Sequence, residues 1–403
     1  MTNDEKWFEK KIDRREFLKK AGIGGAGLAL GVSGASAFFT NKVKEEKNFA
    51  DGDEEISFYG SHQAGITTPM QKNVYFVVLD LHSTDRAEVI QMFKNWTDYS
   101  SKLVDGELVK KDGSNTLLPP SDTGETVGLN PYRLTLTFGV SISFLKKMGL
   151  EKKCPQAFRN FPPFPKEQLQ DKYTGGDIVI QACADDEQVA FHAVRNLVRK
   201  ARNTVTMKWS QSGFAAIGDR LATPRNLFGF KDGTANVTKE KDFDRVVWAD
   251  SKDWMENGAY MAVRRIQMFL DTWDRTNLEE QENTFGRYKE SGAPFGKKNE
   301  FDEVDLSLLP DDSHVRLAKE VEKPLLRRSY SYSDGIDDKT GQFDTGLLFI
   351  SFQKDPDHFV KVQTNLGATD KMNEYVTHIG SGLFACFGGV EKGGYIGQKL
   401  LED

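Results

Sequence analysis

Residues 178–197 read IVIQACADDEQVAFHAVRNL, and residues 347–366 read LLFISFQKDPDHFVKVQTNL. Each stretch begins with an apolar run of strand length, continues through acidic residues typical of a helix N-terminus, and ends with apolar residues at helical spacing. The same strand–helix unit therefore occurs once in each half of the chain. In other strand patterns of the chain, apolar and polar residues alternate, and the apolar residues are not continuous. Such strands favour antiparallel sheets with helices on one face.

Other segments predict the remaining strands and helices. Strand patterns cover residues 74–81, 133–140, 205–214, 260–270 and 326–333, and helical spacing covers residues 84–103 and 271–282. We expect an α+β fold of two ferredoxin-like domains, residues 57–220 and 221–403, joined around residues 217–226. One larger mixed sheet is the alternative.

The composition excludes several classes of function. A net charge of -6 argues against a nucleic-acid partner, which would require a basic face. The three cysteines lie far apart and form neither a metal-binding spacing nor an even disulfide set, so they are interpreted as buried thiols. No Gly-rich phosphate loop, HExxH or GxSxG motif is present, which leaves zinc and serine hydrolysis without support.

Residues 1–40 differ from the rest of the chain. Arg14-Arg15 followed by Phe17-Leu18-Lys19 resembles a twin-arginine export signal, and an uncharged run at 21–39 ends near the small residues Ala35-Ser36-Ala37. We expect a cleaved signal peptide at 1–40, recognised by the twin-arginine translocase, and a secreted or cell-envelope protein. An uncleaved anchor or a chance match is the alternative. Residues 41–56 are expected to form a disordered lead-in.

Spacing alone does not single out a cofactor ligand among the six histidines. His192 and His378 fall in helical patterns, whereas His314 lies in the segment SHVRLA at 313–318. The segment NLFGFKDGTAN at 226–236 places glycines on both sides of Asp232, so the backbone can turn tightly and hold that carboxylate close to a ligand. An Asp-Gly turn without a chemical role is the alternative at this point.

These segments carry a resemblance to a known family. GFKDG at 229–233 is similar to the GxxDG signature of dye-decolourising (DyP-type) peroxidases, and the match extends over residues 226–236. Residues 313–318 resemble the segment with the family's haem-ligating histidine, and LRRSYSY at 326–332 resembles its following strand. The similarity runs from about Gly60 to the C-terminus and, with the export signal, indicates the deferrochelatase/peroxidase branch.

The resemblance implies a site with one haem b per chain, held by the C-terminal domain. His314 is the implied iron ligand, Asp232 the distal acid–base residue, and Arg327 its cationic partner. Asn236 joins the distal network, and Glu374 is expected to hydrogen-bond the far nitrogen of His314. Either Arg265 or Arg287 is expected to pair with a haem propionate, and Gly233 and Thr234 complete the expected haem contacts.

The implied activity is oxidation of dyes, phenols or other small reductants by hydrogen peroxide through a high-valent iron-oxo state. Asp232 would first take a proton from bound peroxide and then return it to the leaving oxygen. Iron release from haem with the porphyrin kept intact is the first alternative, and an exported haem carrier without turnover is the second. Self-association and an iron-uptake partner in the membrane stay open.

Overall fold

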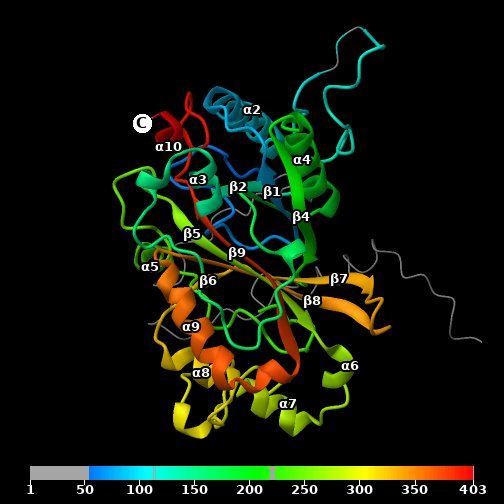
Figure 1. Ribbon diagram of the computed structural model, residues 1–403. Coiled ribbons are helices and arrows are strands. Elements are labelled where there is room, and N and C mark those ends of the chain that lie inside the picture. The colour runs from blue at the N-terminus through cyan, green and yellow to red at the C-terminus, as the bar shows by residue number, and fades with distance from the viewer. Residues whose placement is uncertain (1–53, 112, 114, 218–222, 403) are drawn as a thin grey trace, which may run out of the picture. The chain divides into compact units, whose positions relative to one another are not determined.

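The computed structural model describes residues 54–402 apart from 112, 114 and 218–222 (Figure 1). The expected signal peptide at 1–40, most of the lead-in and the expected boundary between residues 220 and 221 lie outside the described residues. Among the helices in the described ranges, none has the length and apolar character needed to cross a bilayer.

The first half of the described chain forms a four-stranded antiparallel sheet. Its strands are β1 (Asn73–Leu81), β2 (Thr135–Val140), β3 (Ile178–Ala184) and β4 (Val205–Phe214), in the order β2-β3-β1-β4. Helices α2 (Arg86–Val104) and α4 (Glu187–Lys200) connect them, and each begins at an aspartate, Asp85 or Asp186, whose side chain accepts backbone N–H groups. This connection order is that of a ferredoxin-like unit.

The second half repeats that order. Strand β5 (Ala259–Met268) lies between β9 (Val376–Cys386) and β8 (Phe343–Gln353), and β7 (Tyr330–Ile336) pairs with the far edge of β8. The short strand β6 (Leu326–Arg327) also pairs with β8, and α9 (Pro356–Thr369) precedes β9. The prediction of two ferredoxin-like units with antiparallel sheets is therefore confirmed.

Short pairings join the two sheets at both edges. Two residue pairs link β2 to β9, and Phe214 of β4 pairs with Ser331 of β7. All nine strands thus belong to one pairing network, so the expected alternative of a larger sheet also describes part of the arrangement.

The remaining elements are short and connect the strands, except for the last helix, which follows β9. The α-helices are α3 (Ile142–Lys147), α5 (Glu240–Val246), α6 (Leu270–Trp273), α7 (Leu278–Phe285), α8 (His314–Glu320) and α10 (Gln398–Glu402). The 3₁₀ turns are η1 (Glu151–Lys153), η2 (Asp171–Tyr173), η3 (Leu306–Leu308) and η4 (Lys371–Glu374).

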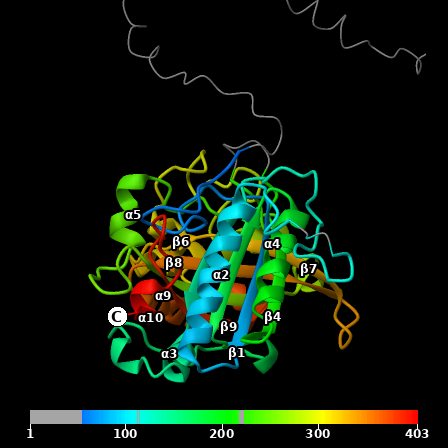
Figure 2. The same cartoon turned by 90° about the horizontal axis from the view of Figure 1, so that it is seen from above.

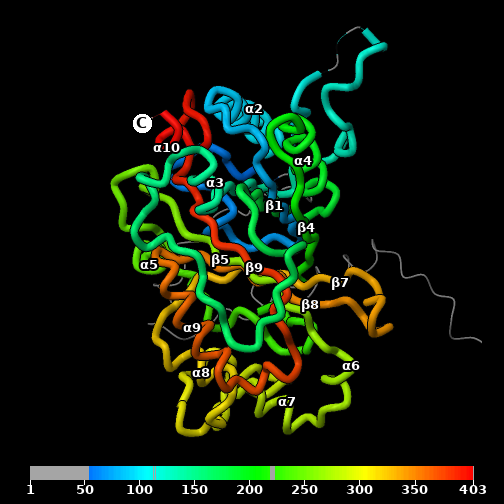
Figure 3. Tube along the Cα trace, viewed as in Figure 1, coloured from blue at the N-terminus to red at the C-terminus, as the bar shows by residue number. Residues whose placement is uncertain are grey.

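The two sheets pack against each other, with helices on their outer faces. Val74, Phe76 and Val78 of β1 share one buried cluster with Leu348, Ile350 and Phe352 of β8. On the far side of the first sheet, α2 and α4 lie side by side (Figure 2). The Cα trace shows α8 and α9 together on the outer side of the second sheet (Figure 3). Apolar side chains are therefore buried between the two sheets and beneath the helices on each outer face, and this burial stabilises the fold.

Three local predictions were wrong. The helix expected at 271–282 is split into α6 and α7, because the Asn277 side chain accepts the N–H of Glu280 and starts a new helix. The strand expected at 326–333 is interrupted at Arg328, whose side chain donates to Thr68 in the first half of the chain. His378 lies in strand β9 and not in a helix.

The interpretation of the cysteines as buried thiols is confirmed for two of the three, whereas Cys154 is only half-buried. All three thiols are free, and Cys183 and Cys386 are buried in the apolar cluster between the sheets.

Candidate active site

His314 is the first residue of α8, and a buried carboxylate orients its ring. Its Nδ1 lies 2.7 Å from Oδ2 of Asp370, while Oδ1 of Asp370 accepts the N–H of Met372. Because Nδ1–H donates to Asp370, the other ring nitrogen, Nε2, keeps its lone pair for a metal. The His314 side chain is 32% exposed, whereas that of Asp370 is 3% exposed.

Electrostatics at His314 follow from three neighbouring charges. Burial disfavours its charged form, but the Asp370 carboxylate outweighs burial, so the pKa of His314 is raised above its ordinary value. Arg327 acts against this shift and Asp232 supports it, so both charges lie within electrostatic range of His314.

The partner predicted for His314 was wrong. Glu374 is 59% exposed and lies 3.6 Å from the ammonium group of Lys371, on the surface turn η4. Asp370 takes the role because it lies where α9 ends and η4 begins, which directs its carboxylate inward.

Asp232 and Arg327 form an ion pair across the site. Arg327 Nη1 donates to Oδ1 of Asp232 at 3.0 Å, and the two side chains are 28% and 22% exposed. Asn236 holds the backbone of Arg327 from both sides, since its amide donates to the Arg327 carbonyl and its oxygen accepts the Arg327 N–H, at 2.7 and 2.8 Å. The three residues predicted as the distal network are therefore brought together.

The turn that carries Asp232 has the backbone that its glycines predict. Gly229 and Gly233 have φ of +82° and +130°, which L-residues rarely adopt. The N–H of Asp232 donates to the Pro224 carbonyl at 2.8 Å and fixes the start of the turn. Thr234 follows, but its hydroxyl donates to Glu300, which also binds Lys231.

The two candidate propionate partners differ in position. Arg287 is buried, and its Nη1 donates to the carbonyls of Gly292 and Glu300. Its charge lies within electrostatic range of Arg327. Burial lowers the pKa of Arg287, Glu300 opposes that shift, and Arg327 adds to it.

The assignment of Arg265 as a haem contact was wrong. Its cross-strand partner is Leu348, which faces the other sheet, so Arg265 points into the space between the sheets. There it is fully buried, stacks between Tyr173 and Tyr332, and pairs with Asp334 at 2.7 Å. Adjacent strand residues point to opposite faces, so its neighbour Arg264 lies on the face that carries Arg327.

The outer face of the second sheet carries an apolar strip beside Arg327. Arg327 pairs with Ser351 of β8 and therefore points to the same face. Phe349 and Leu347 precede Ser351 by two and four residues along β8, so they also lie on this face. Both apolar side chains are only half-buried, although α8 and α9 cover the same side. Phe285 adds an aromatic ring 6.4 Å from that of His314. A flat apolar cofactor with an iron centre fits an imidazole, an apolar strip and an opposing polar pair.

Sequence reasoning missed Asp370 and Arg264. Asp370 is separated by 56 positions from the histidine it contacts, and no local pattern connects them. Arg264 is 1% exposed, donates to Ser381, and pairs with Glu167. It stands beside Arg265 in a strand without clear alternation, so the sequence does not tell which arginine faces the site.

Comparison with known proteins gives a consistent result. Residues 63–215 match the family model for the N-terminal part of Dyp-type peroxidases, and residues 223–391 match the model for the C-terminal part. A protein named deferrochelatase from Escherichia coli O157:H7 is 37% identical to this chain, and the match covers 100% of each protein. The deferrochelatase of Escherichia coli strain K12 is also 37% identical, with 96% of each protein covered.

Solved structures agree with these matches. A DyP-type peroxidase from Streptomyces coelicolor has a TM-score of 0.81 at 37% identity, covering 87% of this chain and 98% of the other. Ferric DtpA from Streptomyces lividans has a TM-score of 0.81 at 38% identity, with coverage of 88% and 98%. The chain therefore belongs to the Dyp-type peroxidase family.

Proposed function

We propose that this enzyme is a haem b peroxidase, which reduces hydrogen peroxide with electrons from dyes, phenols or other small reductants. The observation that carries the proposal is the Asp232–Arg327 ion pair, 3.0 Å long, within electrostatic reach of an imidazole whose Nδ1 is bound to a carboxylate. A binding protein for haem needs the imidazole, but it has no use for an acid–base pair opposite it.

His314 and Asp370 would hold the cofactor. Nε2 of His314 is the ligand atom, and the Nδ1–H···Oδ2 bond fixes the ring and makes its donor nitrogen more basic. Bound haem supplies an iron centre that takes up peroxide and accepts its oxidising equivalents. The apolar residues Leu347 and Phe349 would contact the macrocycle and keep bulk water from its face.

Asp232 would move the proton. Its carboxylate can take a proton from the peroxide oxygen nearer the iron and return it to the farther oxygen, which then leaves as water. Arg327, held in place by Asn236, would stabilise the negative charge that develops on the leaving oxygen. Arg287 would add a second positive charge to this side of the site.

A second candidate function is the release of iron from haem with an intact porphyrin. It is favoured by the relatives named deferrochelatase, which match over nearly the whole chain. The same residues would bind haem as a substrate instead of a resident cofactor. Incubation of the haem-loaded protein with peroxide and a phenol separates the two. Many turnovers with constant haem support the peroxidase, whereas metal-free protoporphyrin formed in step with free iron supports release.

We further propose export by the twin-arginine translocase. The proposal rests on Arg14-Arg15 with the uncharged run at 21–39 and the small residues up to Ala37. Replacement of both arginines by lysine should leave the haem-loaded protein in the cytoplasm, while the unchanged chain is recovered outside it, shortened at about Ala37. Equal export of both forms would contradict this part of the proposal.

A further inference from the structure

A second cluster of ligand-type side chains lies in the first half of the chain, away from the haem site. It comprises Asp122 and Glu125 from the long segment between α2 and β2, and His192 from α4. One donor atom from each residue lies within 4.8 Å of the other two. His192 and Asp122 are buried, with side-chain exposures of 2% and 5%.

One carboxylate oxygen of this cluster, Oε2 of Glu125, accepts no hydrogen bond. Oδ1 of Asp122 accepts the N–H of Gly124 and lies 2.8 Å from His192 Nε2, and Oδ2 accepts the N–H of Val109. Oε1 of Glu125 pairs with Arg195. Oε2 of Glu125 is buried without a hydrogen-bond partner, 3.8 Å from Nε2 of His192. A buried carboxylate oxygen without a donor is costly, and a cation would remove that cost.

The geometry suits a transition-metal ion. With bond lengths of about 2.0–2.1 Å, tetrahedral coordination separates donor atoms by about 3.3 Å. The separations from His192 Nε2 to Asp122 and Glu125 are 2.8 and 3.8 Å, on either side of that value. Small rotations of the two carboxylates would bring all three donors to bonding distance of one ion.

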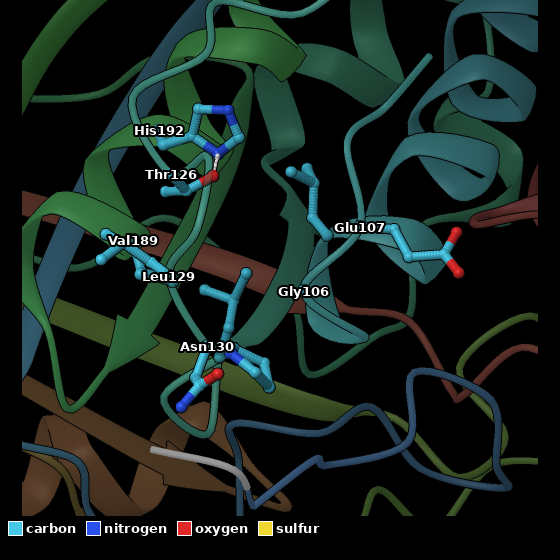
Figure 4. Close-up of a pocket in the computed structure, with 10 residues that line it drawn as sticks. Gly106, Glu107, Thr126, Leu129, Asn130, Val189 and His192 are labelled. Atoms are coloured by element: carbon cyan, nitrogen blue, oxygen red, sulfur yellow. Dashed lines mark hydrogen bonds between the residues drawn. The ribbon is translucent and has the colours of Figure 1, made fainter. Parts of the chain in front are cut away.

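The ring of His192 is oriented as a ligand would be. Its Nδ1 lies 3.0 Å from the Thr126 hydroxyl, beside a cavity of about 10 Å³, and the other ring nitrogen points away from both (Figure 4). If Nδ1–H donates to Thr126, the lone pair of Nε2 faces the two carboxylates.

We propose that Asp122, Glu125 and His192 form a binding site for a divalent transition-metal ion such as Zn²⁺, independent of haem. One nitrogen and two oxygen donors match such ions, and a water molecule would complete the coordination. Asp122 and Glu125 belong to the segment between α2 and β2, and His192 belongs to α4. The ion would therefore cross-link this segment to α4. Bound metal would therefore stabilise the fold.

Zinc binding to the purified, haem-loaded protein tests the proposal. After chelator treatment and removal of the chelator, the protein is titrated with Zn²⁺ in a calorimeter, and bound zinc is counted separately from haem iron. We expect one Zn²⁺ per chain and a higher Tm in its presence. Glu125→Gln keeps the size of the side chain but should weaken binding by more than about 10-fold, and His192→Gln should abolish it.

Glu107→Gln is the matched control. Glu107 belongs to the same segment, but its carboxylate points away from the cavity beside His192, so this variant should bind Zn²⁺ like the unchanged protein (Figure 4). Absence of zinc from the unchanged protein would overturn the proposal. Equal binding by Glu125→Gln and Glu107→Gln would also overturn it, since that result indicates adventitious surface binding. If His192→Gln fails to fold, the two glutamate variants decide the question.

Discussion

The carboxylate of Asp370 lies 2.7 Å from Nδ1 of His314, and the two residues are 56 positions apart in the sequence. Helix α8 supplies the imidazole, and the turn after α9 supplies the carboxylate. A pair of this kind sets the orientation of the ring and the basicity of its other nitrogen. The relationship defines the side of the site that would hold iron, and it leads to the first two predictions.

Asp370→Asn should weaken haem binding or peroxide turnover by about 10- to 100-fold, because the ring loses its charged orienting partner. The measurement is the haem dissociation constant together with the peroxide-dependent rate at saturating haem. Glu374→Gln is the control and should leave both values unchanged, since Glu374 lies on the surface beside Lys371. Impairment of the Glu374 variant but not of the Asp370 variant would overturn the assignment of Asp370 as the partner of His314.

Haem binding should strengthen as pH rises. Asp370 raises the pKa of His314 in the haem-free protein, and a protonated imidazole cannot ligate iron. The sign follows from this shift: the His314–Asp370 pair stabilises the haem-free fold fully below about pH 6.5, the ordinary histidine pKa, and loses that contribution as pH passes the raised value. Titration of haem affinity against pH should show a midpoint above 6.5, and Asp370→Asn should move it lower. A pH-independent affinity would contradict the assignment of His314.

Much of the fold could be predicted from the sequence, because the strand–helix repeat appears twice with helix-capping aspartates in place. Strand β9 was missed, since Gly380, Gly382 and His378 disturb its apolar alternation. The glycine at 380 is required by packing, because a Cβ there would lie 2.8 Å from Tyr173 Cβ.

The site was only partly predictable. His314, Asp232 and Arg327 lie in segments whose pattern resembles a known family, and the structure brings them together. The contacts of Asp370 and the orientations of Arg264 and Arg265 depend on tertiary packing. Two adjacent arginines in one strand face opposite sides of the sheet, and the sequence around them has no alternation that would tell which is which.

Asn236→Ala should slow the reaction with peroxide without weakening haem binding. The substitution removes both hydrogen bonds that fix the Arg327 backbone, and it should lower the free energy of unfolding by about 1–3 kcal/mol. Peroxide kinetics and denaturant unfolding of the haem-loaded variant measure the two effects. A normal peroxide rate in a destabilised variant would show that the position of Arg327 does not matter for the chemistry.

Arg265→Ala should destabilise the protein but leave the haem affinity of the folded fraction unchanged. Arg265 is buried between Tyr173 and Tyr332, and its loss leaves Asp344 without its cationic partner and Asp334 with only the amide of Gln211. Because both aspartates are partly exposed, the expected cost is about 2–3 kcal/mol in the free energy of unfolding. Chemical denaturation and a haem titration provide the two values. Reduced haem affinity with normal stability would return Arg265 to the haem site.

We propose that Asp232 moves the proton in the peroxide reaction. The most direct test is rapid mixing of hydrogen peroxide with the haem-loaded protein and its Asp232→Asn variant, followed by the haem absorption spectrum. We expect equal haem spectra before mixing and a second-order rate constant lower by about 10²- to 10⁴-fold in the variant. Rate constants that agree within about threefold would show that another group transfers the proton.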